Sequence, residues 1–179
     1  MVNTSSERHE QLTQWLHRLV EILRSQGGST WRSLVLTVSG KTAVMDLDGT
    51  QLRLRADGED SLQVHIESIL EPHPINFCSE SETFRDIISG RLTLDAAVAN
   101  GKIYVRGNLQ DLLGINQIVM GILADSAVNP ELQRLWEDFD TLWFRPRSLP
   151  PCQSIEQQKP DYGYLITHVP NDVLNIEVD

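Results

Sequence analysis

The stretch that decides the fold runs from Pro74 to Asn108 and reads PINFCSESETFRDIISGRLTLDAAVANGKIYVRGN. Its apolar spacing and turn residues predict, in chain order, a brief edge strand at 75–77, short helices over 82–88 and 93–99, and a strand over 102–106. Ser79 or Ser81 is expected to cap the first helix, and Gly90 to end it. Short helices and strands mixed in this way predict an α+β fold.

Upstream of this stretch, the sequence predicts a helix followed by an antiparallel meander. Apolar residues recur at every third or fourth position across 6–25, which predicts a helix with one buried face. Four strand-like segments follow, each alternating apolar and polar residues: 33–39, 42–47, 50–55 and 61–67. Asp48-Gly49 is a strong hairpin dipeptide. Asp46 with Asp48 also resembles part of a calcium loop, but the later ligands are missing, so a hairpin turn is expected.

Downstream, residues 109–124 predict a helix that is apolar on nearly every side. Asn116 and Gln117 are almost the only polar residues after its first turn, so most of the helix must be buried or must face something apolar. Gly114 and Gly121 are seven residues apart and therefore lie on one stripe. Each costs about 1 kcal/mol relative to alanine within a helix. Either a close backbone contact or space for a guest molecule would offset that cost.

The character of the chain changes near residue 126. A further helix is expected at 130–143, and the rest of the chain looks irregular, with short strands near 164–166 and 173–176. We therefore expect a first domain at 1–125, which includes the N-terminal amphipathic helix, and a C-terminal extension at 126–179.

Composition excludes several classes of protein. The chain has 179 residues, of which 40% are hydrophobic, and a formal net charge of −10. An acidic chain without a Lys/Arg run gains little from nucleic acid or from anionic lipid, so neither is an expected partner. No window is long and apolar enough for a membrane span, and the N-terminus is not a signal peptide. The two cysteines, Cys78 and Cys152, are expected to be reduced thiols of a cytoplasmic protein.

The sequence carries no recognisable catalytic motif. It lacks a Gly-x-Ser-x-Gly elbow, a Walker loop and a dinucleotide fingerprint. Its histidines show no metal-ligand spacing and are expected to be solvated: His9, His17, His65, His73 and His168. We therefore expect neither an enzyme nor a bound cofactor or metal.

The same central stretch resembles the signature of the sterol-carrier-protein (SCP-type) lipid-binding family. The resemblance rests on the order of the elements and on these residues: Phe77, Ser79, Ser81, Phe84, Ile87-Ile88-Ser89-Gly90-Arg91-Leu92, Ala96-Ala97, Gly101-Lys102-Ile103, Val105 and Gly107-Asn108. It covers about residues 10–125. It implies a five-stranded, mostly antiparallel sheet with helices on one face, enclosing an apolar tunnel. The extension lies beyond the usual domain, which leaves open whether Leu135, Trp136 and Phe139 plug the tunnel.

Apolar faces by themselves are compatible with a dry core or with a cavity, and the resemblance favours the cavity. It implies non-catalytic binding of a fatty acyl, sterol-like or isoprenoid lipid. The residues expected to line the tunnel are Phe84, Ile87, Ile88, Val98, Leu112, Ile115, Val119, Met120, Ile122 and Leu123. The alternative is a protein–protein interaction module that uses this fold without a lipid. Stable membrane insertion is not expected, and a protein partner or a homodimer stays open.

Overall fold

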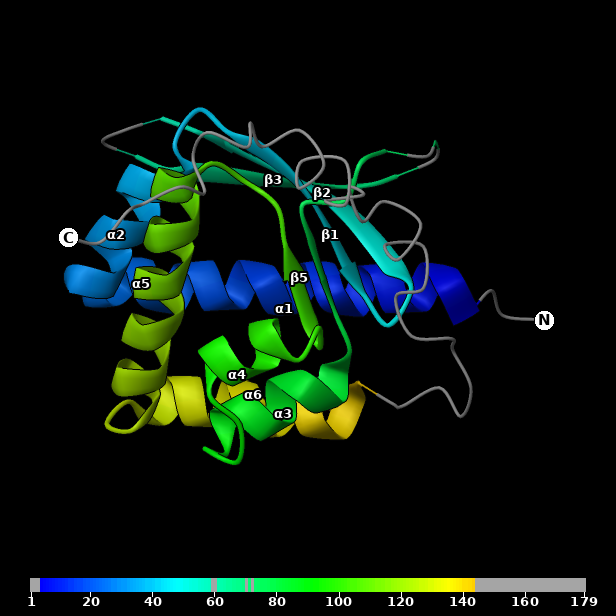
Figure 1. Ribbon diagram of the computed structural model, residues 1–179. Coiled ribbons are helices and arrows are strands. Elements are labelled where there is room, and N and C mark those ends of the chain that lie inside the picture. Colours follow the sequence, from blue (N-terminus) through cyan, green and yellow to red (C-terminus); the bar gives the residue numbers. More distant parts are fainter. Residues whose placement is uncertain (1–3, 59–60, 70, 72, 144–179) are drawn as a thin grey trace, which may run out of the picture. The chain divides into compact units, whose positions relative to one another are not determined.

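The computed structural model describes residues 4–58, 61–69, 71 and 73–143 (Figure 1). The helices and strands of this part of the chain follow one another in the order α1 (Thr4–Gln26), α2 (Ser29–Val38), β1 (Thr42–Leu47), β2 (Thr50–Asp57), β3 (Gln63–Ser68), β4 (Phe77–Ser79), α3 (Ser81–Ile88), α4 (Leu94–Ala99), β5 (Ile103–Val105), α5 (Leu109–Ser126) and α6 (Pro130–Leu142). The predicted α+β class is confirmed. The strands predicted near 164–166 and 173–176 lie outside the described residues.

The five strands form one mixed sheet in the order β3-β2-β1-β4-β5. β1 pairs in parallel with β4, and the other three pairs are antiparallel. The hairpin between β1 and β2 has the predicted two-residue turn, because Leu47 pairs directly with Thr50. Asp48 and Gly49 have φ angles of 50° and 79°. Such positive angles are typical of the type I′ turn that fits the twist of a hairpin.

The prediction of a strand over 33–39 is wrong, because residues 33–38 belong to α2 and Ser39 is its C-cap. A short apolar run satisfies the strand and helix patterns equally well, so tertiary packing decides between them. α2 packs along α5. Leu36 is one of the alternating apolar residues that suggested a strand. It lies on the solvent side of α2, where it is 84% exposed.

Helices α1 and α6 cover the apolar face of the sheet. In the antiparallel register Met45 lies opposite Leu52, and both side chains belong to a core cluster completed from α1, β1 and the end of α6: Leu12, Leu47, Phe139 and Trp143. Trp15 joins the two helices, because its ring lies 5.2 Å from Trp136 and 5.1 Å from Phe139 between centroids. The core of the sheet therefore includes α6, which belongs to a compact unit extending from Met1 to Leu149.

Two local expectations around β4 are wrong. Cys78 is buried and disulfide-bonded rather than a reduced thiol. Neither Ser79 nor Ser81 caps α3 with its side chain; the N-cap residue is Glu80, whose side chain makes no capping hydrogen bond. Instead, the backbone N–H of Ser81 donates to Asp48 Oδ1 at 2.9 Å. A carboxylate in the hairpin turn therefore accepts a hydrogen bond from the first backbone N–H group of α3, although the two segments are far apart in the sequence.

Among the described residues, no single helix is long and apolar enough to cross a membrane. α5 and α6 meet that length and composition only as a pair, and the pair is bent by 103°.

Candidate functional site

Helix α5 presents three different faces, and the first is closed by α2. An ideal Cβ atom at Gly114 would lie 2.5 Å from Thr37 Oγ1, and one at Gly121 would lie 2.5 Å from Thr30 Oγ1. Ile118, on the same stripe, is the one α5 residue that is fully buried. The glycines are therefore explained by close approach of two helices, the first of the two alternatives that their spacing allowed.

The second face of α5 is aliphatic and half-buried. It consists of Leu112, Ile115, Val119, Ile122 and Leu123. At about 100° per residue these positions cover an arc of about 100° directly beside the glycine stripe. In the described part of the chain, α5 packs against α2 and, less extensively, α6, and it has no comparable contact with a strand. This face is thus turned toward the interior without a sheet packed on it.

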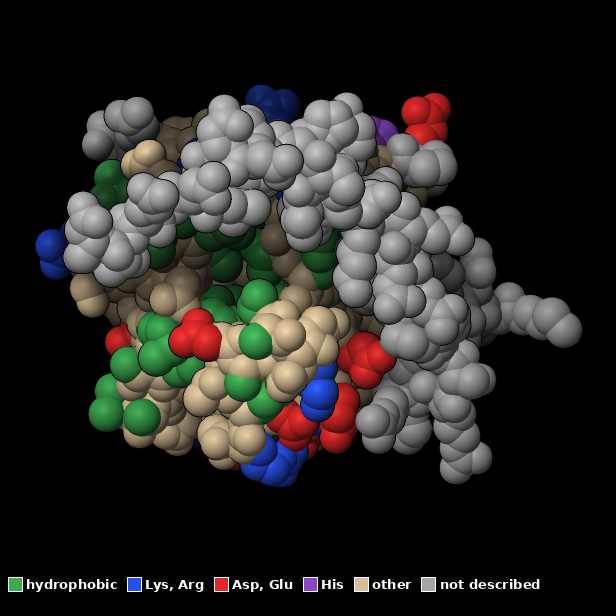
Figure 2. Space-filling model, in the orientation of Figure 1, with side chains coloured by type: hydrophobic (Ala, Val, Ile, Leu, Met, Phe, Trp, Pro, Cys, Tyr) green, Lys and Arg blue, Asp and Glu red, His purple; other side chains and the backbone are tan. Residues whose placement is uncertain are grey.

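Across from this face, Figure 1 shows β5, with α4 below and α1 behind. In the space-filling view the same region, at the centre of the picture, is recessed and shows hydrophobic side chains (Figure 2). We call this region the α5 recess. Such concave, mainly apolar sites are typical of small-molecule binding.

The far side of the recess is built by a second core cluster of Ile87, Ala97 and Ile103, which are buried. Leu123 of α5 packs against it, together with four residues that were not among the predicted ligand contacts: Phe77, Leu92, Leu94 and Val105. Ile103 and Val105 alternate along β5, so a period-two pattern in the predicted strand over 102–106 was the available signal.

The structure brings together some of the predicted site residues and separates others. The five aliphatic residues of the second α5 face share the recess wall, and Ile87 lies in the cluster that Leu123 contacts. Ile88 is half-buried, and Phe84 packs against the cluster under α1, edge-on to Phe77 at 5.8 Å between ring centroids. Val98 and Met120 are 46% and 53% exposed, so neither is enclosed in the interior.

The third face of α5 is open to solvent. Its exposed hydrophobic residues are Leu109, Leu113 and Met120, at 72%, 62% and 53% exposure. The polar residues beside them, Asn116 and Gln117, are uncharged.

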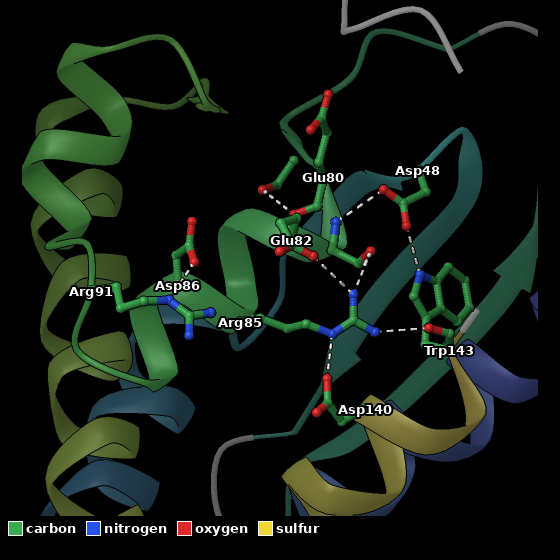
Figure 3. A network of polar contacts seen from close by, with 10 residues as sticks. Asp48, Glu80, Glu82, Arg85, Asp86, Arg91, Asp140 and Trp143 are labelled. Atoms are coloured by element: carbon green, nitrogen blue, oxygen red, sulfur yellow. Dashed lines mark hydrogen bonds and ion pairs between the residues drawn. The ribbon is translucent and has the colours of Figure 1, made fainter. Parts of the chain in front are cut away.

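A polar network joins the hairpin turn, α3 and the end of α6 (Figure 3). Trp143 Nε1 donates to Asp48 Oδ2 at 2.7 Å, and Arg85 Nη2 donates to the Trp143 carbonyl oxygen at 2.8 Å. Arg85 also pairs with Asp140 and lies 3.6 Å from Glu82. Every nitrogen of the Arg85 guanidinium therefore has a partner within the protein. We call these contacts the Arg85 network. They hold the hairpin turn, α3 and the end of α6 together.

The polar face of the sheet carries a cavity of about 450 Å³ lined by residues that include Arg53, Arg55, Glu67 and His73. Arg53 contacts the Nε2 atom of His73, whose Nδ1 atom lies 2.9 Å from the Glu71 carbonyl oxygen. The expectation that His73 is merely solvated is therefore wrong. Arg55 pairs with Asp57 at 2.9 Å, and Arg53 lies opposite Glu67 in the antiparallel register of β2 and β3.

No group of three or more metal-ligating side chains that could hold a metal ion occurs among the described residues. Comparisons of the chain with protein-family models, with curated proteins and with solved structures found no match.

Proposed function

We propose that the chain binds a hydrophobic molecule of the fatty acyl, sterol-like or isoprenoid class in the α5 recess, without catalysis, as a protein of the sterol-carrier type. The observation that carries the proposal is the second face of α5. Its five aliphatic side chains, from Leu112 to Leu123, are half-buried, and Leu123 at the end of this face packs against the cluster of Ile87, Ala97 and Ile103. Apolar surface that remains partly hydrated gains about 25 cal/mol per Å² when a ligand covers it.

The order of elements supports this interpretation. β4, α3, α4, β5 and α5 follow one another in the order that the family resemblance implies, and the sheet has five strands. Leu135, Trp136 and Phe139 pack toward α1 and the sheet core. The proposal includes no nucleic acid, cofactor or stable membrane insertion, and a cytoplasmic location stays a prediction.

The first test is native mass spectrometry of the purified protein, followed by organic extraction of any bound molecule. We expect a discrete additional mass that extracts as a lipid, or uptake of a fluorescent fatty alcohol by the empty protein. Affinity should rise about fourfold for each added methylene until the recess is full, because burying one methylene contributes about 0.8 kcal/mol.

A matched pair of variants on α5 locates the site. Val119→Trp fills the recess from its wall and should reduce probe affinity at least tenfold. Ala124→Trp introduces the same side chain at an exposed position of the same helix and should leave the affinity unchanged. Far-ultraviolet circular dichroism and the melting temperature report whether both variants fold. An empty protein that takes up no probe at any chain length would contradict the proposal and favour the interaction module.

A further inference from the structure

The cavity on the polar face of the sheet has the size of a small-molecule site. Its volume is about 450 Å³, and residues of β1, β2, β3 and the segment 73–76 line it. Pockets for small molecules usually measure about 300–1,000 Å³. Arg53 and Arg55 alternate along β2 with the core residues Leu52 and Leu54, so the cavity lies on the side of the sheet opposite the core. We call it the β2 cavity.

The positive charge of Arg53, which lines this cavity and is half-buried, has no acidic partner among the described residues. Glu67 is directly opposite in the strand register, but the two side chains form no ion pair. The guanidinium instead contacts Nε2 of His73, whose Nδ1 atom lies 2.9 Å from the Glu71 carbonyl oxygen. A carbonyl oxygen can only accept, so Nδ1 carries the proton and Nε2 accepts from Arg53. A neutral imidazole thus orients Arg53 without compensating its charge.

Two further groups in the cavity have N–H donors to spare. Arg55 lies two residues further along the same face of β2, about 6–7 Å away. Its Nε atom pairs with Asp57 at 2.9 Å, which leaves both Nη atoms without a partner in the described part of the chain. Asn76 Oδ1 accepts the Val44 backbone N–H at 2.9 Å, so the side-chain NH₂ group of Asn76 also remains available as a donor.

The charges around the cavity restrict what it can bind. Its lining includes two arginines and one glutamate, so the formal charge of the lining is positive, while the chain as a whole has a net charge of −10. Exposed charges are screened beyond about 8–10 Å at physiological salt. A small anion in the cavity therefore responds mainly to the arginines, whereas a nucleic acid or an anionic bilayer also meets the acidic surface around them.

We propose that the β2 cavity binds a small organic oxyanion, a carboxylate or a phosphate monoester, between the guanidinium groups of Arg53 and Arg55. The planar fork of N–H donors on a guanidinium matches two oxygens of either group. The amide of Asn76 supplies a further donor, and Val44 and Pro74 provide apolar surface for the organic part of the ligand. This site is independent of the lipid site proposed at the α5 recess.

The test is isothermal titration calorimetry of the full chain with benzoate, phenyl phosphate and inorganic phosphate at low ionic strength. We expect benzoate or phenyl phosphate to bind at one site per chain, and more tightly than inorganic phosphate, because the ring covers apolar surface. The tighter of the two organic probes identifies the preferred anionic group. Benzyl alcohol, which has the ring without the charge, should not bind.

A matched pair of arginine variants locates the site. Arg55→Gln should reduce the affinity for the better probe at least tenfold, because a charged double hydrogen bond is lost. The control is Arg91→Gln, which should leave the affinity unchanged. Arg91 and Arg55 are 64% and 63% exposed, and each pairs through Nε with an aspartate at 2.9 Å, but Arg91 is not part of the cavity. Equal losses of affinity in both variants would mean nonspecific attraction and overturn the inference.

Glu67→Gln provides a test that does not depend on a loss of binding. It removes the one carboxylate of the lining, which repels an anion, so affinity should rise about threefold or more. Unchanged or lower affinity in this variant overturns the inference, as does the absence of binding of both organic anions to the wild type at millimolar concentration. Binding of benzyl alcohol as tight as that of benzoate also overturns it, because the arginines would then contribute nothing.

Uptake of the fluorescent fatty alcohol separates this inference from the proposed function. Arg55→Gln should take up the alcohol normally, and Val119→Trp should bind the anionic probe normally, since the two sites lie on different elements. Loss of anion binding in Val119→Trp, with its fold intact, would place the anion at the α5 recess and overturn the assignment to the β2 cavity.

Discussion

At the residue scale, Asp48 connects three elements that are far apart in the sequence. Its left-handed conformation forms the hairpin turn, while its carboxylate accepts hydrogen bonds from Ser81 N and Trp143 Nε1. The sequence pattern identified the turn but not these bonds, because an Asp-Gly dipeptide reports local backbone preference and contains no information about distant partners. The carboxylate thus substitutes for the serine cap that was expected at α3.

We predict that Asp48→Asn lowers the free energy of unfolding by about 1–3 kcal/mol. Asparagine tolerates the same backbone conformation but offers only one acceptor oxygen, which is uncharged. One of the two partly buried donors therefore loses its acceptor, and the other keeps only a neutral one. Denaturant titration measures the loss. The control Asp57→Asn affects a surface pair with Arg55 and should cost less than about 1 kcal/mol. Equal losses of unfolding free energy in both variants would show that the hydrogen bonds of Asp48 stabilise the fold no more than a surface ion pair does.

At the scale of elements, the packing of α2 on α5 explains both a correct and a wrong prediction. The glycine spacing on α5 correctly indicated a close contact, but the sequence did not show which segment makes it. The segment at 33–39 was assigned to the sheet because its alternation is compatible with a strand. In the structure this segment is a helix that packs closely at Gly114 and Gly121, and such a contact is a property of the assembled pair.

We predict that Gly114→Ala and Gly121→Ala each lower the free energy of unfolding by about 1–2 kcal/mol, despite a gain of about 1 kcal/mol in helix propensity. The new methyl group would clash with a threonine, whose branched side chain cannot rotate away because its Cβ atom is also within 3.2 Å. The loss at Gly114 should be smaller in a Thr37→Ala background, which a double-mutant cycle measures. Asn116→Ala, on the exposed side, should be neutral or slightly stabilising. Stabilisation by both glycine substitutions would refute the close contact.

At the scale of the whole molecule, α6 completes the core of the described unit. Leu132, Leu135 and Phe139 are buried, and Trp15 Nε1 donates to the Leu135 carbonyl oxygen at 3.1 Å. The division of the chain at residue 125 stays a prediction about where a family domain ends. Removing α6 would expose the cluster beneath α1. A truncation near residue 126 would therefore disturb folding and would not be a clean test of the proposed ligand binding.

We predict that Phe139→Ala destabilises the protein by about 3–5 kcal/mol, the usual cost of removing a buried aromatic ring. Leu142→Ala, three residues later on the same helix but 59% exposed, should cost less than about 1 kcal/mol. Thermal and denaturant unfolding provide the comparison. A small effect at Phe139 would mean that α6 is a dispensable appendage after all.

The sequence by itself determined most of the helices and strands, the α+β class and the Asp48-Gly49 turn, because these follow from local periodicity and turn chemistry. It also identified the aliphatic half of the recess wall, since apolar residues repeat along α5. Tertiary structure alone decided three features: the helical state of α2, the parallel pairing of β1 with β4, and the division of α5 into faces toward α2, recess and solvent. Periodicity predicts on which sides of a helix the apolar residues lie. Which of those residues are covered depends on where the other helices pack.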